Sequence, residues 1–178
     1  MAGSPGVKRL WAPWRAEYIY CGDRPAGRSR RRCLFCRLPE EGDDRASLIL
    51  YRGRRAFVVM NRFPYNNGHL MVAPFRHVAG FAELTPAEER DMFRLLRLSL
   101  GALRRAFKPH GFNVGANLGA VAGAGVVGHV HLHIVPRWQG DTNFMPLLGE
   151  AKVVSEHLLS TYDRLAAALS RLTVGRPK

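Results

Sequence analysis

The nine residues from Gly128 to Pro136 constrain this chain more than any other segment, because histidine and aliphatic residues alternate there in the order Gly-His-Val-His-Leu-His-Ile-Val-Pro. Successive side chains of a β-strand point to opposite faces, so the pattern predicts a strand with a histidine face and an apolar face. The histidine face holds His129, His131 and His133. Imidazoles titrate near neutral pH, bind metals and act as nucleophiles, so this face is a candidate functional site.

The alternative interpretation is a strand whose solvated polar face happens to consist of histidines. The chain has 7 histidines in 178 residues, and His129, His131 and His133 fall in register within one short segment. That concentration favours a functional site. The other histidines singled out, His69, His110 and His157, are expected to be ordinary polar residues.

The overall composition predicts a single globular unit. The 178 residues are 47% hydrophobic, and no apolar run approaches the length that crosses a bilayer. Since the N-terminus also lacks a signal-type segment, we expect a cytoplasmic protein with no membrane partner. The net charge of +13 suits either a nucleic-acid surface or polyanionic substrates. No nucleic-acid-binding motif accompanies the charge, so a nucleic-acid partner is the less favoured interpretation.

Hydrophobic periodicity and turn residues predict an α+β fold with an antiparallel sheet. The capping sequence Thr85-Pro86-Ala87-Glu88 begins a long helix over residues 86–107, and Pro109 with Gly111 ends it. Besides the triad strand, the expected elements are strands at Ser47–Tyr51, Ala56–Met60, His69–Ala73 and Phe112–Leu118, and a second helix at Ser155–Leu172.

The chain divides into three parts. Residues 1–32 form a basic, partly flexible segment, with an aromatic-rich stretch at Leu10–Ile19 that is expected to pack against the body or a partner subunit. Residues 33–150 form the main domain. Residues 151–178 form a C-terminal helix and tail.

Two of the three cysteines stand close together as Cys33-Leu34-Phe35-Cys36. Without a secretion signal, that spacing favours metal binding over a disulfide. A closed structural zinc site needs two further nitrogen or sulfur ligands, for which His77 and His129 are candidates. A reduced, partly buried dithiol is the alternative, and Cys21 is interpreted as an incidental thiol.

The triad and three flanking segments resemble the histidine-triad (HIT) family, in the branch of the bacterial diadenosine tetraphosphate phosphorylases. The flanking segments are Asn61-Arg62-Phe63-Pro64-Tyr65-Asn66-Asn67-Gly68-His69-Leu70-Met71-Val72-Ala73-Pro74, Gly111-Phe112-Asn113-Val114-Gly115-Ala116-Asn117 and Pro136-Arg137-Trp138. The resemblance covers about Leu10 to Glu150. It implies the HIT-like antiparallel sheet, a homodimer, and a nucleotide as substrate.

The resemblance also implies roles for the histidines and cysteines. Zinc-bearing members of the family use a cysteine pair, a histidine after the Pro-ending strand and the first triad histidine, which correspond here to Cys33, Cys36, His77 and His129. The middle histidine, His131, would attack the α-phosphate of a nucleotide and form a covalent nucleotidyl intermediate, with its far nitrogen held by a backbone carbonyl near His129. His133 would donate to the phosphate or to the leaving-group oxygen.

Substrate-binding residues follow from the same resemblance. Asn61 stands where the family places an Asp or Asn on the ribose hydroxyls, and Asn117 resembles a phosphate-contacting asparagine, with Asn113 as a weaker candidate. Backbone N–H groups of the glycine-rich segment, including Gly123 and Gly125, are expected to bind phosphate oxygens.

One difference between this sequence and the family pattern bears on the reaction. Many hydrolases of the family carry Gln four residues before the first histidine, followed by Ser or Thr, whereas Gly125 and Val126 stand here. Small residues leave room for inorganic phosphate, which favours a phosphorylase that converts diadenosine tetraphosphate and phosphate into ATP and ADP. The change also removes a serine that phosphorylases can use. A hydrolase of dinucleoside polyphosphates or nucleoside phosphoramidates, and a non-catalytic nucleotide-binding module, are therefore the alternatives.

Overall fold

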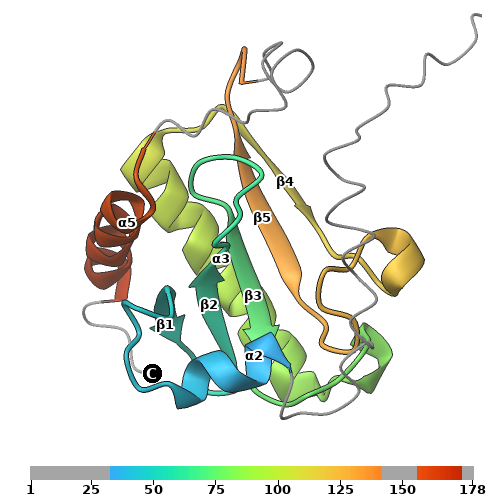
Figure 1. Ribbon diagram of the computed structural model, residues 1–178. Coiled ribbons are helices and arrows are strands. Elements are labelled where there is room, and N and C mark those ends of the chain that lie inside the picture. Colours follow the sequence, from blue (N-terminus) through green and yellow to red (C-terminus); the bar gives the residue numbers. More distant parts are fainter. Residues whose placement is uncertain (1–32, 142–155, 174–178) are drawn as a thin grey trace, which may run out of the picture.

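Within residues 33–141 and 156–173, which the computed structural model describes, five antiparallel strands form one sheet in the order β1-β2-β3-β5-β4 (Figure 1). The strands are β1 (Ile49–Arg52), β2 (Ala56–Met60), β3 (Leu70–Pro74), β4 (Gly111–Gly115) and β5 (Leu132–Arg137). With the helices described below, they confirm the predicted antiparallel α+β fold. The predictions for Leu10–Ile19 and Cys21 lie outside the described residues.

The limits of β1, β3, β4 and β5 differ from the predicted ones, and β3 covers Leu70–Pro74 rather than His69–Ala73. β1 begins at Ile49 because Leu48 has a positive φ of 60°, which interrupts extended backbone. β4 ends at Gly115, which pairs with His133, because β5 begins only one residue earlier at Leu132 and offers no partner further along. The predicted extension of β4 to Leu118 is therefore wrong, whereas β2 has the predicted limits.

The long helix α3 (Pro86–Phe107) has the predicted limits. Thr85 accepts a hydrogen bond from the Glu88 backbone N–H, and the Glu88 carboxylate accepts one from the Thr85 N–H, as in the predicted capping box. In the described part of the chain, the other helices are α2 (Leu34–Arg37), α5 (Leu158–Thr173) and the short 3₁₀ turns Leu38–Glu40, Phe81–Glu83 and Ala120–Ala122. None of the helices within the described residues combines the length and hydropathy needed to cross a membrane.

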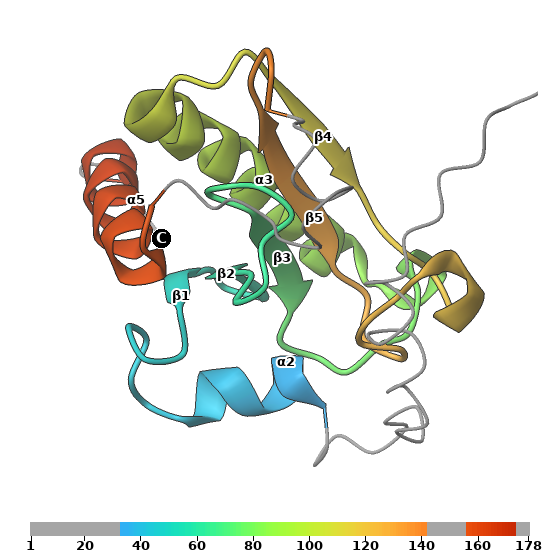
Figure 2. The same cartoon turned by 45° about the horizontal axis from the view of Figure 1, so that its top comes forward.

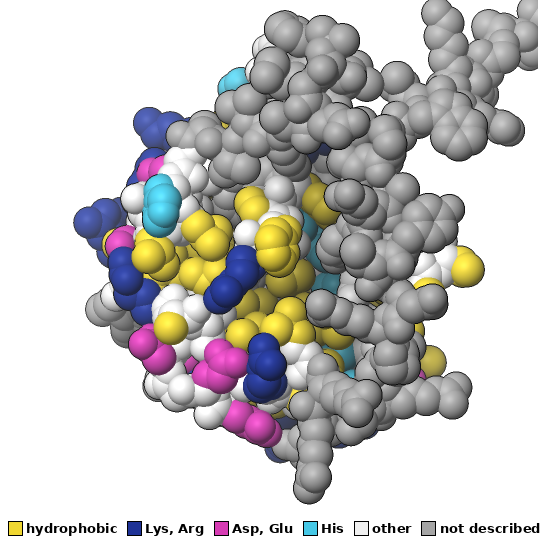
Figure 3. All heavy atoms as spheres, in the orientation of Figure 1, with side chains coloured by type: hydrophobic (Ala, Val, Ile, Leu, Met, Phe, Trp, Pro, Cys, Tyr) yellow, Lys and Arg dark blue, Asp and Glu magenta, His cyan; other side chains and the backbone are white. Residues whose placement is uncertain are grey.

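The two faces of the sheet have different coverings. Leu132 and Ile134 of β5 are buried on the face that α3 covers, while His133 points to the opposite face, so the predicted alternation is confirmed within β5. The prediction that His129 and His131 belong to the same strand is wrong, because both precede β5, which begins at Leu132. α2 lies on the side of the sheet away from α3 (Figures 1 and 2). Hydrophobic side chains gather on that side, with histidine side chains visible among them (Figure 3).

An ion pair ties the segment after β3 to the start of α3. The Nε and Nη2 atoms of Arg76 donate to the two carboxylate oxygens of Glu88 at 2.8 and 2.7 Å. These bonds, with further ones from Thr85, lower the pKa of Glu88 from 4.5 to about 2. Because His77 follows Arg76 directly, the pair also holds a candidate metal ligand in place.

The depressed Glu88 pKa predicts a pH-dependent contribution to stability. The ion pair contributes fully above the ordinary pKa of 4.5, and the contribution is lost as the pH falls from there towards about 2. Thermal unfolding of the wild type and of Glu88→Gln should therefore differ most near neutral pH and converge in acid. A difference in melting temperature that stays constant over this pH range would contradict the prediction.

Candidate active site and metal centre

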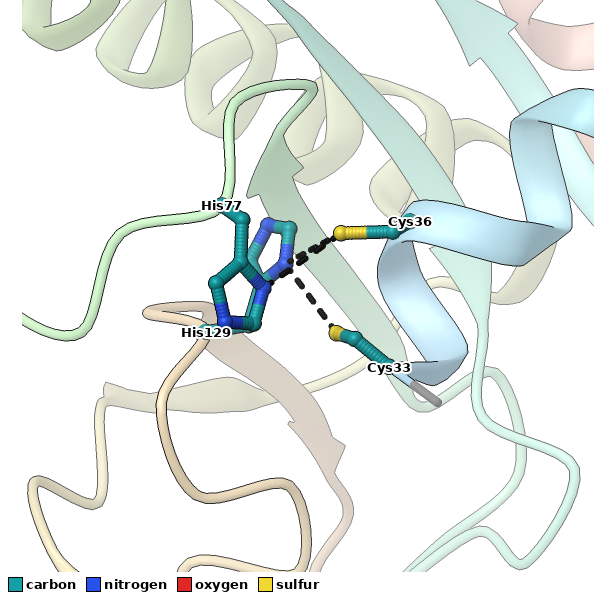
Figure 4. Close-up of side chains that lie close together, drawn as sticks. All are labelled: Cys33, Cys36, His77 and His129. Carbon is teal, nitrogen blue, oxygen red and sulfur yellow. Dashed lines mark hydrogen bonds between the residues drawn. The ribbon is translucent and has the colours of Figure 1, made fainter. Parts of the chain in front are cut away.

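The four predicted metal ligands converge at one end of the sheet. Cys33 and Cys36 flank the start of α2, His77 follows β3, and His129 precedes β5, yet their ligand atoms all lie within 4.8 Å of one another. Figure 4 shows the two imidazoles and the two thiols pointing towards a common centre. Cys33, Cys36 and His129 are buried and His77 is half-buried. Segments far apart in sequence thus form one Cys2His2 arrangement.

The geometry of this arrangement fits a tetrahedral metal ion. The His129 Nε2–H donates to the Pro74 carbonyl at 2.8 Å, which leaves the Nδ1 lone pair directed at the thiols. Burial lowers the pKa of His129 to about 4, so its imidazole is neutral at pH 7. Sulfur–nitrogen distances are 3.3, 3.4 and 3.6 Å. Tetrahedral bonds of about 2.3 Å to sulfur and about 2.0 Å to nitrogen place such atoms about 3.5 Å apart.

His131 lies next to this centre as a neutral imidazole. Its Nδ1 is 2.9 Å from the backbone oxygen of His129, and because a carbonyl only accepts, Nδ1 carries the proton. The side chain is 4% exposed, and this burial lowers its pKa. The Nε2 atom therefore keeps a lone pair at pH 7, the form in which imidazole attacks an electrophile.

His133 has the opposite tautomer, and His69 sets it. The Tyr65 backbone N–H donates to His69 Nδ1 at 3.1 Å, so the proton of a neutral His69 is on Nε2. That Nε2 is 2.9 Å from Nδ1 of His133, which must accept. Burial, and then the neighbouring His131, lower the pKa of His133 to about 4, so its single proton is on Nε2. The rings of His131 and His133 lie 4.7 Å apart, so an unprotonated ring nitrogen lies beside a ring that carries an N–H donor.

The prediction that His69 is an ordinary polar residue is therefore wrong. Its side chain is 1% exposed, and its ring also stacks on that of Tyr65 at 4.8 Å. By contrast, His110 and His157 are exposed. His69 stands just before β3, and β3 pairs with β5, for example Met71 with His133, far along the chain. The pattern of one sequence does not reveal that pairing.

The structure gives the predicted substrate residues definite local contacts. Asn61 donates from Nδ2 towards His69 Nδ1 at 3.3 Å and accepts from the Phe63 N–H, so its amide lies beside the histidines. Asn113 accepts from Arg137 at 2.9 Å in β4. Asn117 donates to the Gly123 carbonyl at 3.1 Å and so holds the glycine-rich loop.

Two backbone N–H groups of the glycine-rich loop already donate hydrogen bonds within the loop. Gly123 has a positive φ of 83°, and its N–H donates to the Ala120 carbonyl at 2.9 Å. The Ala124 N–H donates to the Gly119 carbonyl at 3.3 Å. A phosphate group would thus have to replace these bonds to use either amide, which makes Gly125 the better candidate of the two predicted glycines.

Comparison with known proteins identifies a family, two relatives and a solved structure of similar fold. A family profile described as HIT domain matches residues 44–140. A Mycobacterium tuberculosis protein named AP-4-A phosphorylase is 36% identical over 170 residues, covering 93% of this chain and 86% of that protein. The asymmetrical bis(5'-nucleosyl)-tetraphosphatase of Schizosaccharomyces pombe is 35% identical over 95 residues, 53% of this chain and 52% of that protein. A zinc-bound histidine triad family protein from Mycobacterium smegmatis has a similar fold, with a TM-score of 0.66, 23% identity, and coverage of 83% of this chain and 100% of the other.

The profile match begins before β1 and ends after β5, so it contains the whole sheet, α3 and all three triad histidines. It spans more than half of the chain, and the M. tuberculosis relative extends the match over nearly all of it. This chain is therefore a member of the histidine-triad (HIT) family, as its triad segment predicted.

Proposed function

We propose that this protein is a nucleotidyl transferase that cleaves dinucleoside polyphosphates, and that its reaction converts diadenosine tetraphosphate and inorganic phosphate into ATP and ADP. The observation that carries the proposal is the pair of opposite tautomers. His131 presents an unprotonated Nε2, and His133, with its ring 4.7 Å away, presents a protonated one. The similarity to a protein named AP-4-A phosphorylase over 93% of the chain supports this substrate class.

The proposed reaction has two displacements. The His131 Nε2 attacks the α-phosphorus of one adenosine, a P–N bond forms, and the P–O bond to the leaving ATP breaks. The His133 Nε2–H hydrogen-bonds to the bridging oxygen and stabilises the charge that develops there. An oxygen of inorganic phosphate then attacks the same phosphorus, the P–N bond breaks, and ADP leaves with His131 restored.

Other residues would bind the substrate. Asn61 lies beside His69 at the edge of the site and would contact the ribose hydroxyls. Gly125 would donate its backbone N–H to a phosphate oxygen, while Gly123 and Asn117 would hold the loop that carries it. Asn113, which is bonded to Arg137, is the weakest candidate of these five residues.

We further propose that the Cys2His2 centre binds structural zinc. Its two thiols and two imidazoles are the ligand set that zinc prefers in closed sites, and four protein ligands leave no position for a catalytic water. A homodimer is also proposed. β4 stands at the edge of the sheet with Val114 45% exposed, and an edge strand offers backbone groups with which a second copy would pair.

Product analysis tests the proposed function. The protein is incubated with diadenosine tetraphosphate, with and without millimolar phosphate, and AMP, ADP and ATP are separated. ADP plus ATP that appear only with phosphate are expected. AMP plus ATP in both tubes would instead establish the hydrolase, the activity for which the S. pombe relative is named. An absence of turnover on dinucleoside polyphosphates and on nucleoside phosphoramidates would favour a nucleotide-binding module.

His69→Phe should slow this reaction without preventing binding. Phenylalanine keeps a buried ring at this position but cannot donate to His133 Nδ1, so His133 is no longer held with its proton on Nε2. We expect kcat to fall by roughly 10-fold to 100-fold with little change in KM. The matched control is His110→Phe, at an exposed histidine that accepts from the Gln139 N–H. Equal kcat values for the two variants would contradict this role for His69.

A further inference from the structure

Phe35 connects the candidate metal centre to the proposed nucleophile. It stands between Cys33 and Cys36 and is only 1% exposed. Its ring centroid lies 4.6 Å from that of His131, at an interplanar angle of 43°, and 5.4 Å from that of His129. The segment Cys33–Cys36 thus places an aromatic ring against His131 as well as supplying two metal ligands.

The His131 ring needs a second contact of this kind. The bond from Nδ1 to the His129 carbonyl fixes one atom of the imidazole, but small coupled rotations about χ1 and χ2 can still tilt the ring while that bond is kept. The Phe35 ring, packed at 4.6 Å, limits this tilt on one side and excludes water from that side, while the His133 ring lies 4.7 Å away. The direction of the Nε2 lone pair, on which in-line attack depends, is then determined by the hydrogen bond together with these ring contacts.

The position of Phe35 depends in turn on the metal ligands. α2 has only four residues, Leu34–Arg37, and a helix of this length is not stable on its own. The Cys33 and Cys36 thiols anchor it, at 3.3 and 3.6 Å from Nδ1 of His129. His129 also supplies the carbonyl to which His131 is bonded, so ligand and nucleophile share one segment.

We propose that Phe35 is a positioning residue through which metal ligation by the Cys2His2 centre fixes the ring orientation of His131. Ligation holds α2 against the sheet, and α2 packs the Phe35 ring on the imidazole. The inference rests on the proposed function in that His131 is taken as the nucleophile. The metal centre would then affect the reaction without any contact between the metal and the substrate.

Phe35→Leu and Phe57→Leu form a matched pair for the kinetic test. Both side chains are buried and their ring centroids lie 6.4 Å apart, so the two substitutions remove the same volume from one cluster, but of these two rings it is Phe35 that packs on His131. In the metal-loaded proteins, Phe35→Leu should lower kcat by about 10-fold or more while KM changes by less than about 3-fold. Phe57→Leu should change kcat by less than about 2-fold. Equal kcat values for the two variants would overturn the proposal.

Histidine ring resonances provide a readout that does not need turnover. In the metal-loaded proteins, the ¹H and ¹³C ring signals of His131 should shift in Phe35→Leu and stay close to wild type in Phe57→Leu. Removing the metal with a chelator should move these signals in the wild type and in Phe57→Leu, and much less in Phe35→Leu. An equal metal-dependent shift in all three proteins would overturn the proposal, and if the metal-free chain unfolds, the loaded comparison decides alone. Should no nucleotide be turned over, the proposed function fails while this spectroscopic comparison still tests the coupling.

Discussion

His131→Ala is expected to abolish turnover of dinucleoside polyphosphates and to leave the fold and the metal content unchanged. The substitution removes the Nε2 lone pair that would form the P–N bond. The neighbouring His133 cannot replace it, because its Nδ1 accepts from His69 and its Nε2 carries the proton. Removal of a covalent nucleophile lowers kcat by about 10⁴-fold or more, and we expect a loss of that size here.

The measurement compares kcat, metal content and thermal unfolding for His131→Ala and for His110→Ala. His110 is an exposed histidine outside the triad, so its variant should keep wild-type values in all three. Because His131 is itself buried, some decrease in melting temperature is expected from the cavity. A folded, metal-loaded His131→Ala that retains more than a few per cent of the activity would show that another group is the nucleophile.

Cys36→Ser is expected to have the largest effect on stability. A serine hydroxyl is a poor zinc ligand, and the ring nitrogens of the half-buried His77 and the buried His129 would lose their common partner. Because a structural metal contributes its binding free energy to folding, loss of the metal should lower the free energy of unfolding by about 3 kcal/mol or more. The bound zinc should fall from one per chain towards none.

Cys21→Ser is the control, since Cys21 is not among the four predicted ligands. Metal analysis and denaturant unfolding, each with and without a chelator, separate the two variants. The chelator should destabilise the wild type and Cys21→Ser to the level of Cys36→Ser and have little effect on Cys36→Ser itself. A Cys36→Ser protein that is as stable and as metal-loaded as the wild type would exclude the Cys2His2 centre as a structural metal site.

Much of the fold was readable from local patterns. The capping box at Thr85 and the terminating Pro109 fix α3, because helix ends are set by residues near them in sequence. The alternation of histidines and aliphatic residues likewise determines which face of β5 is buried. The metal centre could not be predicted from local pattern alone. The spacing of Cys33 and Cys36 indicates metal binding, but the assignment of His77 and His129 as the other two ligands came from the family resemblance.

The interactions that sequence could not supply are long-range ones. His69 meets His133 only because β3 and β5 are neighbours, and Phe35 meets His131 only because α2 lies against the sheet. Backbone conformations such as the positive φ of Leu48 are equally hidden, since an aliphatic residue rarely adopts one. For His69 and Phe35, the partner lies far away in the sequence, so no local pattern contains it.

The most direct test of the proposed mechanism is to trap the intermediate. The metal-loaded protein is mixed with diadenosine tetraphosphate in the absence of phosphate, quenched within the first turnover under alkaline conditions that preserve phosphoramidates, and analysed by peptide mass spectrometry. The mechanism predicts one adenylyl group on the peptide that contains His129, His131 and His133, located on His131, acid-labile, and discharged as ADP when phosphate is added before the quench. Turnover without any adduct, or an adduct on a residue other than His131, would contradict it.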